Sequence, residues 1–176
     1  MIFKRHVMQI NLESKIINWK TWPPEYRWIP WNQSLLEPMA ELAFMALSPT
    51  TDAILFPRFK TRESCKESVA RMMTQSNFFA LASGIMELPN RIYVGGIIGA
   101  ILEDHTGWIQ NQFVDPEKHG HGFGSFLTEH LLMAFLQNGI TQVGFHVTAT
   151  NTSSIRLYSR YGFEIVETIE MTPREY

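Results

Sequence analysis

The sequence predicts an α/β (α+β) fold with a central mixed, mostly antiparallel sheet, flanked by about four helices. Three strand candidates, at 78–87, 91–102 and 107–114, follow one another with turn residues between them, so an antiparallel meander is expected. The pattern then changes to helix, strand, helix and strand. A helix that joins two strands of one sheet favours a parallel pair, here the strands that end at Val114 and Thr148.

The N-terminal part of the chain carries weaker signals. Residues 1–24 lack clear periodicity and end in two prolines, so they are expected to form an N-terminal extension. Residues 25–176 are expected to form one domain that begins with a short strand. Ser34 is the expected N-cap of the first helix, because Glu37 lies three residues later in capping-box spacing, and this helix should end near Leu47.

A linker and a second helix follow. Residues 48–60 contain two prolines and the apolar patch 54–56, which predicts a stiff loop. Thr61 is the expected N-cap of a helix over 62–74. Long, apolar linkers often shape substrate sites, and this one is expected to do so.

The segment from His119 to Ser125 contains three glycines at alternate positions, between a predicted strand and a predicted helix. Glycine lets the backbone approach a ligand closely, and the N–H groups at a helix N-terminus attract an anion. The segment therefore predicts a cradle for a diphosphate. It is not a P-loop, because no lysine follows Gly124, and it departs from the dinucleotide fingerprint, because the third glycine comes one residue early.

The remaining pattern is Arg/Gln-x-x-Gly-x-Gly/Ala, with His119 at its first position. It resembles the acyl-CoA loop of the GNAT superfamily of N-acetyltransferases. Downstream, Asn151 precedes a helix with Leu157-Tyr158 and then Gly162-Phe163, which is similar to the second signature of that family. The resemblance covers the C-terminal half strongly and the N-terminal half only in its order of elements.

The resemblance implies the GNAT acyltransferase fold, whose two parallel strands splay apart around the pantetheine arm of acetyl-CoA or another acyl-CoA. It also implies direct attack by a primary amine in a ternary complex, with Tyr158 as the general acid for the leaving sulfur. The expected acceptor is a small-molecule amine or a protein amino group. The residues implied in cofactor binding are Phe113, Val114, His119, Gly120, His121, Gly122, Phe123, Gly124, Ser125 and Asn151.

His119 stands where the family usually has arginine or glutamine. A neutral imidazole lacks the permanent charge and the fork of arginine, so a lower or more pH-dependent cofactor affinity is expected. A metal site of His119, His121 and His130 is the competing interpretation. No Cys, Asp or Glu with ligand spacing completes it, and His130 lies on an apolar helix stripe, so a packed histidine and no metal are expected.

The general base is not identified by the sequence. Many relatives carry a glutamate on the strand before the loop, but here Gln110, Asn111 and Gln112 are all amides. The nearest titratable candidates are Glu103, Asp104 and His146, none of which the pattern selects. A non-catalytic acyl-CoA-binding module on the same fold therefore stays open as a second hypothesis. Tyr158 favours the enzyme, because binding needs no leaving-group acid.

Composition limits the function classes. The chain has 176 residues, 45% hydrophobic content and a net charge of −2, and its Lys and Arg are scattered, so nucleic acid is not an expected partner. Its start does not resemble a signal peptide, and no apolar run has the length of a membrane span. A single cysteine, Cys65, fits a reduced, cytoplasmic protein. A homodimer is left open.

Overall fold

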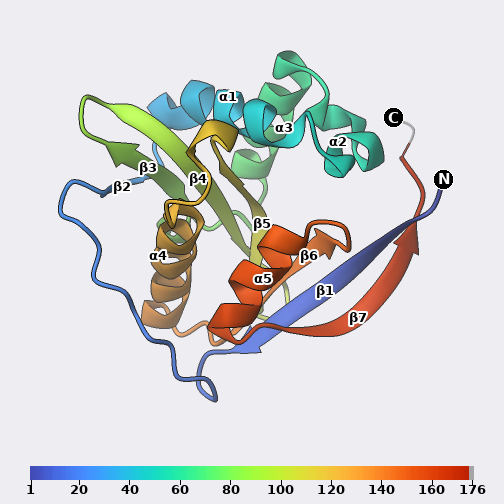
Figure 1. Cartoon of the computed structure of the whole chain (residues 1–176). Helices are drawn as coiled ribbons and strands as arrows, with labels where there is room; N and C mark the ends of the chain where they lie inside the picture. The colour runs from blue at the N-terminus through green and yellow to red at the C-terminus, as the bar shows by residue number, and fades with distance from the viewer. Residues whose placement is uncertain (175–176) are drawn as a thin grey trace.

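The computed structural model describes residues 1–174 (Figure 1). Its centre is a seven-stranded sheet in the order β2-β3-β4-β5-β6-β1-β7. The strands are β1 (Phe3–Asn11), β2 (Arg27–Pro30), β3 (Gly84–Leu88), β4 (Ile92–Ile101), β5 (Gly107–Val114), β6 (Gln142–Thr148) and β7 (Glu164–Met171). The helices are α1 (Leu36–Leu47), α2 (Thr51–Leu55), α3 (Arg62–Thr74), α4 (Phe123–Gln137) and α5 (Thr152–Tyr161).

The sheet is mixed, as the sequence predicts. All neighbouring strands pair antiparallel except β5 and β6, which are parallel and are connected through α4. Successive residues of β4 point to opposite faces of the sheet and pack into two different hydrophobic cores. Ile97 packs with Leu127 and Phe135 of α4, whereas Ile98 packs with Met39 of α1 and Val69 of α3. Both faces of the sheet are therefore covered by helices, and the fold class is confirmed.

The parallel pairing is short, and this shortness opens the sheet. Only Gly107 and Trp108 of β5 are in register with β6. Beyond them β5 pairs with β4 alone, and the register with β4 shifts so that Gln110 is an extra, bulged residue. A bulge bends and twists a strand. From Ile109 to Val114 the two strands therefore diverge into a wedge.

Residues 1–24, which the sequence predicts to be an extension of the domain, contribute a strand to the central sheet. This strand, β1, lies between β6 and β7 in the sheet. The buried residues Val7 and Met8 are consecutive, because the register with β7 shifts between them. A bulge of this kind breaks the alternation of apolar and polar residues, so the strand has no clear period in the sequence.

The chain between β1 and β2 is held against α4. The buried carboxylate of Glu129 accepts hydrogen bonds from the Trp22 indole at 2.9 Å and from the Lys20 backbone N–H at 3.1 Å. It also accepts one from the hydroxyl of Tyr161 at 2.8 Å. Residues 20–22 are thus anchored to the domain through a single side chain on α4.

Three local predictions were wrong in detail. Asn32, not Ser34, caps the first helical segment, because its side chain accepts the Ser34 N–H ahead of a 3-10 turn that leads into α1. The linker 48–60 folds into α2 and a second 3-10 turn, and the first half of the strand expected at 78–87 also contains a 3-10 turn. The end of α1 at Leu47 and the N-cap at Thr61 are confirmed, and Thr61 also forms a capping box with Ser64.

Candidate functional site

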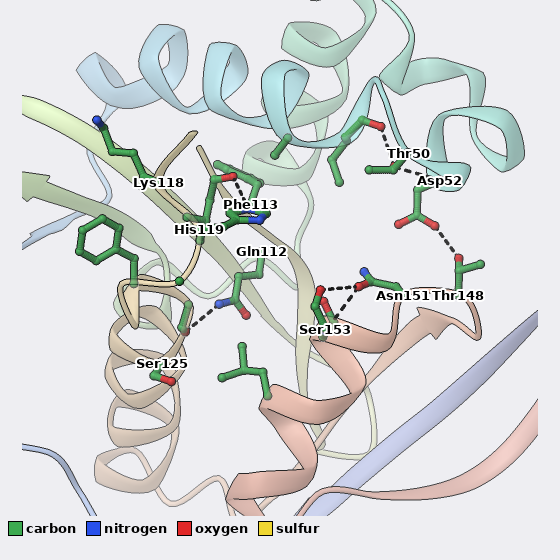
Figure 2. Close-up of a pocket in the computed structure, with 18 of the residues that line it drawn as sticks. Thr50, Asp52, Gln112, Phe113, Lys118, His119, Ser125, Thr148, Asn151 and Ser153 are labelled. Atoms are coloured by element: carbon green, nitrogen blue, oxygen red, sulfur yellow. Dashed lines mark hydrogen bonds between the residues drawn. The ribbon is translucent and has the colours of Figure 1, made fainter. Parts of the chain in front are cut away.

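Two cavities lie at the wedge between β5 and β6. The first, called here the loop cavity, has a volume of about 580 Å³ and is lined by the β5–α4 loop, the start of α5 and the α1–α2 turn (Figure 2). The second, the wedge cavity, has about 530 Å³ and is lined by β1, β5, β6 and the segment around α2. Asp52, Gln112 and Asn151 line both, so the two spaces meet at these side chains.

The residues implied in cofactor binding gather at the loop cavity. All of them except His121 line it. The ring of His121 instead stacks on that of Phe123, with centroids 5.6 Å apart. The sequence motif and the strand end thus surround one space, although their binding roles remain predictions.

The glycines of the loop have the backbone conformation that the motif requires. Gly120 and Gly122 have φ values of +84° and +80°, in the left-handed region that side chains with a Cβ rarely adopt. Gly122 is the N-cap of α4, and no side chain caps the first turn. The positive end of the helix dipole and the N–H groups of the first turn therefore face the loop.

His119 lies at the rim of the loop cavity and contacts its own strand. A ring nitrogen, Nε2, lies 3.3 Å from the carbonyl oxygen of Val114, which requires the tautomer that carries the proton on Nε2. This contact links the loop to the end of β5. In this tautomer the one N–H of the neutral ring is donated to the protein's own backbone. An arginine at this position would instead have N–H groups left to donate to a phosphate.

Two cations that the sequence analysis did not name also line the loop cavity. Lys118 precedes the motif, and Arg160 lies on the exposed side of α5. Among the described residues, Asp52 is the single carboxylate in the lining. The position of Lys118, next to His119, was a signal available in the sequence, whereas Arg160 comes close only through folding.

Asn151 has a structural role at the start of α5. It is the N-cap of α5, and its Oδ1 accepts the Ser154 N–H at 3.2 Å. Figure 2 shows Asn151 across the cavity from Phe113 and His119. The cap therefore fixes an amide side chain at the junction of the two cavities.

Gln112 connects three elements at the same junction. Its Nε2 donates to the carbonyl oxygen of Gly124 at 2.8 Å, and its Oε1 accepts from the hydroxyls of Thr128 and Tyr158. Tyr158 is buried, and its side chain lines the wedge cavity. Burial raises the pKa of this phenol well above its ordinary value, so it is protonated at neutral pH.

An ion pair links β1 to α2 beside the junction. Arg5 lies 3.4 Å from a carboxylate oxygen of Asp52 and donates to the hydroxyl of Thr148 at 3.1 Å. Thr148, at the end of β6, donates in turn to Asp52 (Figure 2). Burial lowers the pKa of the Arg5 guanidinium, and the charge of Asp52 opposes that shift. The sequence contained no signal for this pair, because its members lie 47 residues apart.

The three candidate bases are placed very differently. His146 lines the wedge cavity, where its ring meets the ring of Trp108 at 5.1 Å. Desolvation lowers the pKa of His146, and the nearby charge of Arg5 adds to the shift. Glu103 and Asp104 lie in the β4–β5 turn and line neither cavity, and Asp104 accepts the Thr106 N–H at 3.0 Å.

His130 is a packed histidine, as expected. Its ring stacks on Trp28 at 5.0 Å, and its Nδ1 lies 2.9 Å from the carbonyl oxygen of Phe126. In residues 1–174, no group of three or more His, Cys, Asp and Glu side chains lies close enough to hold a metal ion. Among the helices of the same residues, none combines the length and apolar content that crossing a membrane requires.

Comparison with known proteins identifies the family. Residues 53–163 match the family model described as the acetyltransferase (GNAT) family. The chain belongs to the GNAT family. Members of this family use acyl-CoA donors, and the resemblance seen in the two sequence motifs is thereby confirmed.

Solved GNAT structures share the fold. A GCN5-related N-acetyltransferase from Sphaerobacter thermophilus superposes with a TM-score of 0.72 at 19% identity, over 99% of this chain and 53% of that one. The ribosomal-protein-S18-alanine N-acetyltransferase from Escherichia coli gives a TM-score of 0.64 at 15% identity, over 86% of this chain and 96% of that one. At these identities the likeness concerns the fold.

A curated relative matches a shorter stretch. The mycothiol acetyltransferase of Saccharomonospora viridis is 42% identical over 55 residues, which is 31% of this GNAT chain and 18% of the relative. The chain thus spans a minor part of that protein and about half of the Sphaerobacter chain.

Proposed function

We propose that this GNAT protein is an N-acetyltransferase that transfers the acetyl group of acetyl-CoA to a primary amine by direct attack in a ternary complex. The observation that carries the proposal is the meeting of two cavities at Gln112 and Asn151. A donor in the loop cavity and an acceptor in the wedge cavity would be adjacent at this junction. Holding both reactants in place supports transfer without a covalent enzyme intermediate.

The chemistry of the loop cavity supports CoA as the donor. The amides of residues 119–124 and the N-terminus of α4 are the proposed ligands of the diphosphate, and Lys118 and Arg160 add positive charge. Phe113 and Val114 are the proposed backbone contacts of the pantetheine arm, because β6 does not pair with this part of β5. Asn151 is the proposed contact from α5.

The reaction exchanges one bond for another. The amine nitrogen bonds to the thioester carbon, the carbon–sulfur bond breaks, and the sulfur leaves as a thiolate that needs a proton. Tyr158 is the proposed source of that proton. Its hydroxyl lies at the junction, held by Gln112, and burial keeps it protonated. Burial raises the pKa of this phenol further above that of a thiol, so the proton transfer depends on the negative charge that develops on sulfur as the carbon–sulfur bond breaks.

His146 is the proposed base for the amine proton. It is a titratable side chain of the wedge cavity that the lowered pKa keeps neutral at pH 7, so it can accept a proton. The other proton acceptor in that lining, Asp52, is engaged by Arg5 and Thr148. His146 therefore fits the role better than Asp52, Glu103 or Asp104.

A panel of acyl-CoAs against primary amines, with detection of the free CoA thiol, tests this function. The expected result is thiol release that requires both an amine and acetyl-CoA, and that saturates in each. Binding of CoA by calorimetry without thiol release from any pair would instead indicate a non-catalytic acyl-CoA-binding module. Absence of CoA binding would contradict both hypotheses.

A further inference from the structure

The junction of the two cavities contains a carboxylate that the proposed transfer chemistry does not use. The described residues that line both cavities are Leu47, Asp52, Gln112, Asn151 and Ser154, and of these only Asp52 has a charged side chain. In the proposed transfer, the thioester carbon and the attacking nitrogen meet at this junction. An alkylamine has a pKa of about 10, so it arrives as an ammonium ion. The junction must therefore hold a cation before the nitrogen can attack.

The other polar side chains of the junction offer an ammonium little. An ammonium ion donates hydrogen bonds and accepts none, so it needs acceptor oxygens. Oε1 of Gln112 already accepts from two hydroxyl groups. Oδ1 of Asn151 accepts from the Ser154 N–H and from the Ser153 hydroxyl, each at 3.2 Å. These amide oxygens are neutral and engaged, which leaves the carboxylate of Asp52 as the acceptor best suited to a cation.

One oxygen of the Asp52 carboxylate is available to a ligand. Arg5 and the hydroxyl of Thr148 both donate to Oδ1. In the part of the chain that the structure describes, no group donates to Oδ2. Figure 2 shows this second oxygen directed toward the open centre of the cavity, away from Thr148. Because a carboxylate has about four acceptor sites, Oδ2 can accept an N–H of a ligand while both existing bonds are kept.

The local structure holds Asp52 in place. Its backbone N–H donates to the hydroxyl of Thr50, the N-cap of α2, at 3.2 Å. Its side chain is 23% exposed, and its distance of 3.4 Å from Arg5 is longer than that of a strong charge-assisted hydrogen bond. Partial removal from water strengthens the attraction between a carboxylate and a cation relative to the open surface. Asp52 is therefore a positioned anion with binding capacity left.

Asp52 and His146 lie on the same side of β6. His146 and Thr148 are two residues apart in this strand, so their side chains point to the same face, about 7 Å apart. Thr148 in turn holds Asp52. An ammonium ion at Asp52 would thus have the proposed base on its own side of the sheet. His146 would take one proton from the nitrogen, whose freed electron pair then bonds to the thioester carbon.

We infer that Asp52 binds the acceptor as an ammonium ion and directs its nitrogen to the junction. This assignment rests on the proposed acyl transfer and specifies its substrate class, an amine that is protonated at neutral pH. Anilines, which are uncharged at this pH, and alcohols are then poor acceptors. The role differs from that of a base, because Asp52 keeps its charge throughout the reaction and removes no proton.

A matched pair of ligands tests the inference by binding alone. The cationic probe is 2-phenylethylamine, because Trp108 and Phe145 contribute rings to the wedge cavity, and 2-phenylethanol is its uncharged counterpart. Calorimetry of the CoA-loaded protein at neutral pH should give a Kd roughly ten- to hundredfold lower for the amine, the effect of one charge-assisted hydrogen bond. The preference should shrink as salt rises, because the site is partly open to solvent.

Variants of Asp52 locate the effect. Asp52→Asn keeps an oxygen for the Thr148 hydroxyl but lacks the charge, so it should lose most of the preference for the amine and raise its KM roughly tenfold. Asp52→Glu keeps the carboxylate and should retain part of both. Glu41→Gln is the matched control, because Glu41 also pairs with an arginine, Arg62 at 3.0 Å, but lines neither cavity. Thermal melting checks that each variant is folded.

Three results would overturn the inference while leaving the acyl transfer to be judged by thiol release. They are no stronger binding of 2-phenylethylamine than of 2-phenylethanol by the parent protein, an undiminished preference in Asp52→Asn, and a loss of CoA affinity in Asp52→Asn that matches its loss of amine affinity. The last would assign Asp52 to the donor. If no amine is acetylated but 2-phenylethylamine binds in an Asp52-dependent manner, the ammonium site stands and the proposed transfer fails.

Discussion

The hydroxyl of Tyr158 donates a hydrogen bond to Oε1 of Gln112, which joins α5 to β5 at the junction of the two cavities. Gln112 is fixed from the other side by the carbonyl oxygen of Gly124, at 2.8 Å. The proposed acid is thus aligned by a side chain that cannot itself take its proton. An amide at position 112 positions the phenol, whereas a carboxylate there would compete for the proton.

Tyr158→Phe should lower kcat by about 10²–10⁴-fold, the usual contribution of a general acid, and leave CoA affinity nearly unchanged. The ring stays, so the packing against Phe145 and Phe163 is retained. Tyr161→Phe is the matched control, because its hydroxyl bonds to Glu129 outside both cavities. Steady-state kinetics with calorimetry of CoA measures both effects. A kcat within about twofold of the parent value would mean that Tyr158 is not the general acid and has a structural role.

Gly122→Ala should weaken CoA binding at least tenfold. At φ +80° an alanine costs roughly 1–2 kcal/mol of backbone strain, and the loop would shift to relieve it. Gly139→Ala has the same strain, at φ +74° with open space around the added Cβ, but lies after α4 and away from the loop. Calorimetric titration with CoA compares the two variants. Equal CoA affinity in both would remove the loop from the cofactor site.

His146→Gln should remove the acid limb of the kcat/KM profile. In the parent protein this limb should lie below pH 6.5, because desolvation lowers the pKa of His146 and the neutral form is the active one. Activity should therefore rise with pH through the lowered pKa and be flat at pH 7. Loss of a general base typically costs about 10²–10⁴-fold. An unchanged acid limb in the variant would exclude His146 as the base.

Because His130 is partly buried, the folded protein should be less stable at acidic pH than at pH 7. Burial lowers the pKa of His130 in the folded protein below 6.5. Between pH 6.5 and that lower pKa the unfolded chain therefore binds a proton that the folded chain does not bind. Stability is therefore full above pH 6.5 and falls as the pH drops from 6.5 toward the folded-state pKa. His130→Phe keeps a ring beside Trp28 and lacks the titrating group. Urea unfolding at pH 5 and pH 7 should show a smaller pH dependence in the variant; equal dependence contradicts the assignment.

Cys65 should not react with a thiol reagent in the native protein. The side chain is buried, and burial raises its pKa to about 11, with a further contribution from the charge of Glu41. At pH 8 only about one molecule in a thousand would carry the thiolate, the reactive form. Titration with a thiol reagent should find no fast-reacting group before denaturation and one afterwards. A fast native reaction would mean that the helix α3 opens readily.

Sequence patterns were sufficient where the determinants lie close together in the chain. Turn residues, caps and periodicity within a few positions set the order of strands and helices from residue 78 onward, the helix after the glycine loop and the N-cap at Thr61. The two family motifs are local in the same way. They predict the fold, and the residues that they imply in cofactor binding line the loop cavity, with His121 as the exception.

Tertiary structure decided whatever depends on distant segments. β1 belongs to the sheet because it pairs with both β6 and β7. Its bulge breaks the alternation of apolar and polar residues by which a strand is recognised in the sequence. Asp52 meets Arg5 and Thr148, and Gln112 meets Tyr158, across separations of 46 to 96 residues. Such contacts are set by the packing of whole elements, which a local pattern does not encode. The sequence itself therefore determined the family and the glycine loop, and only the folded protein revealed the junction that the two cavities share.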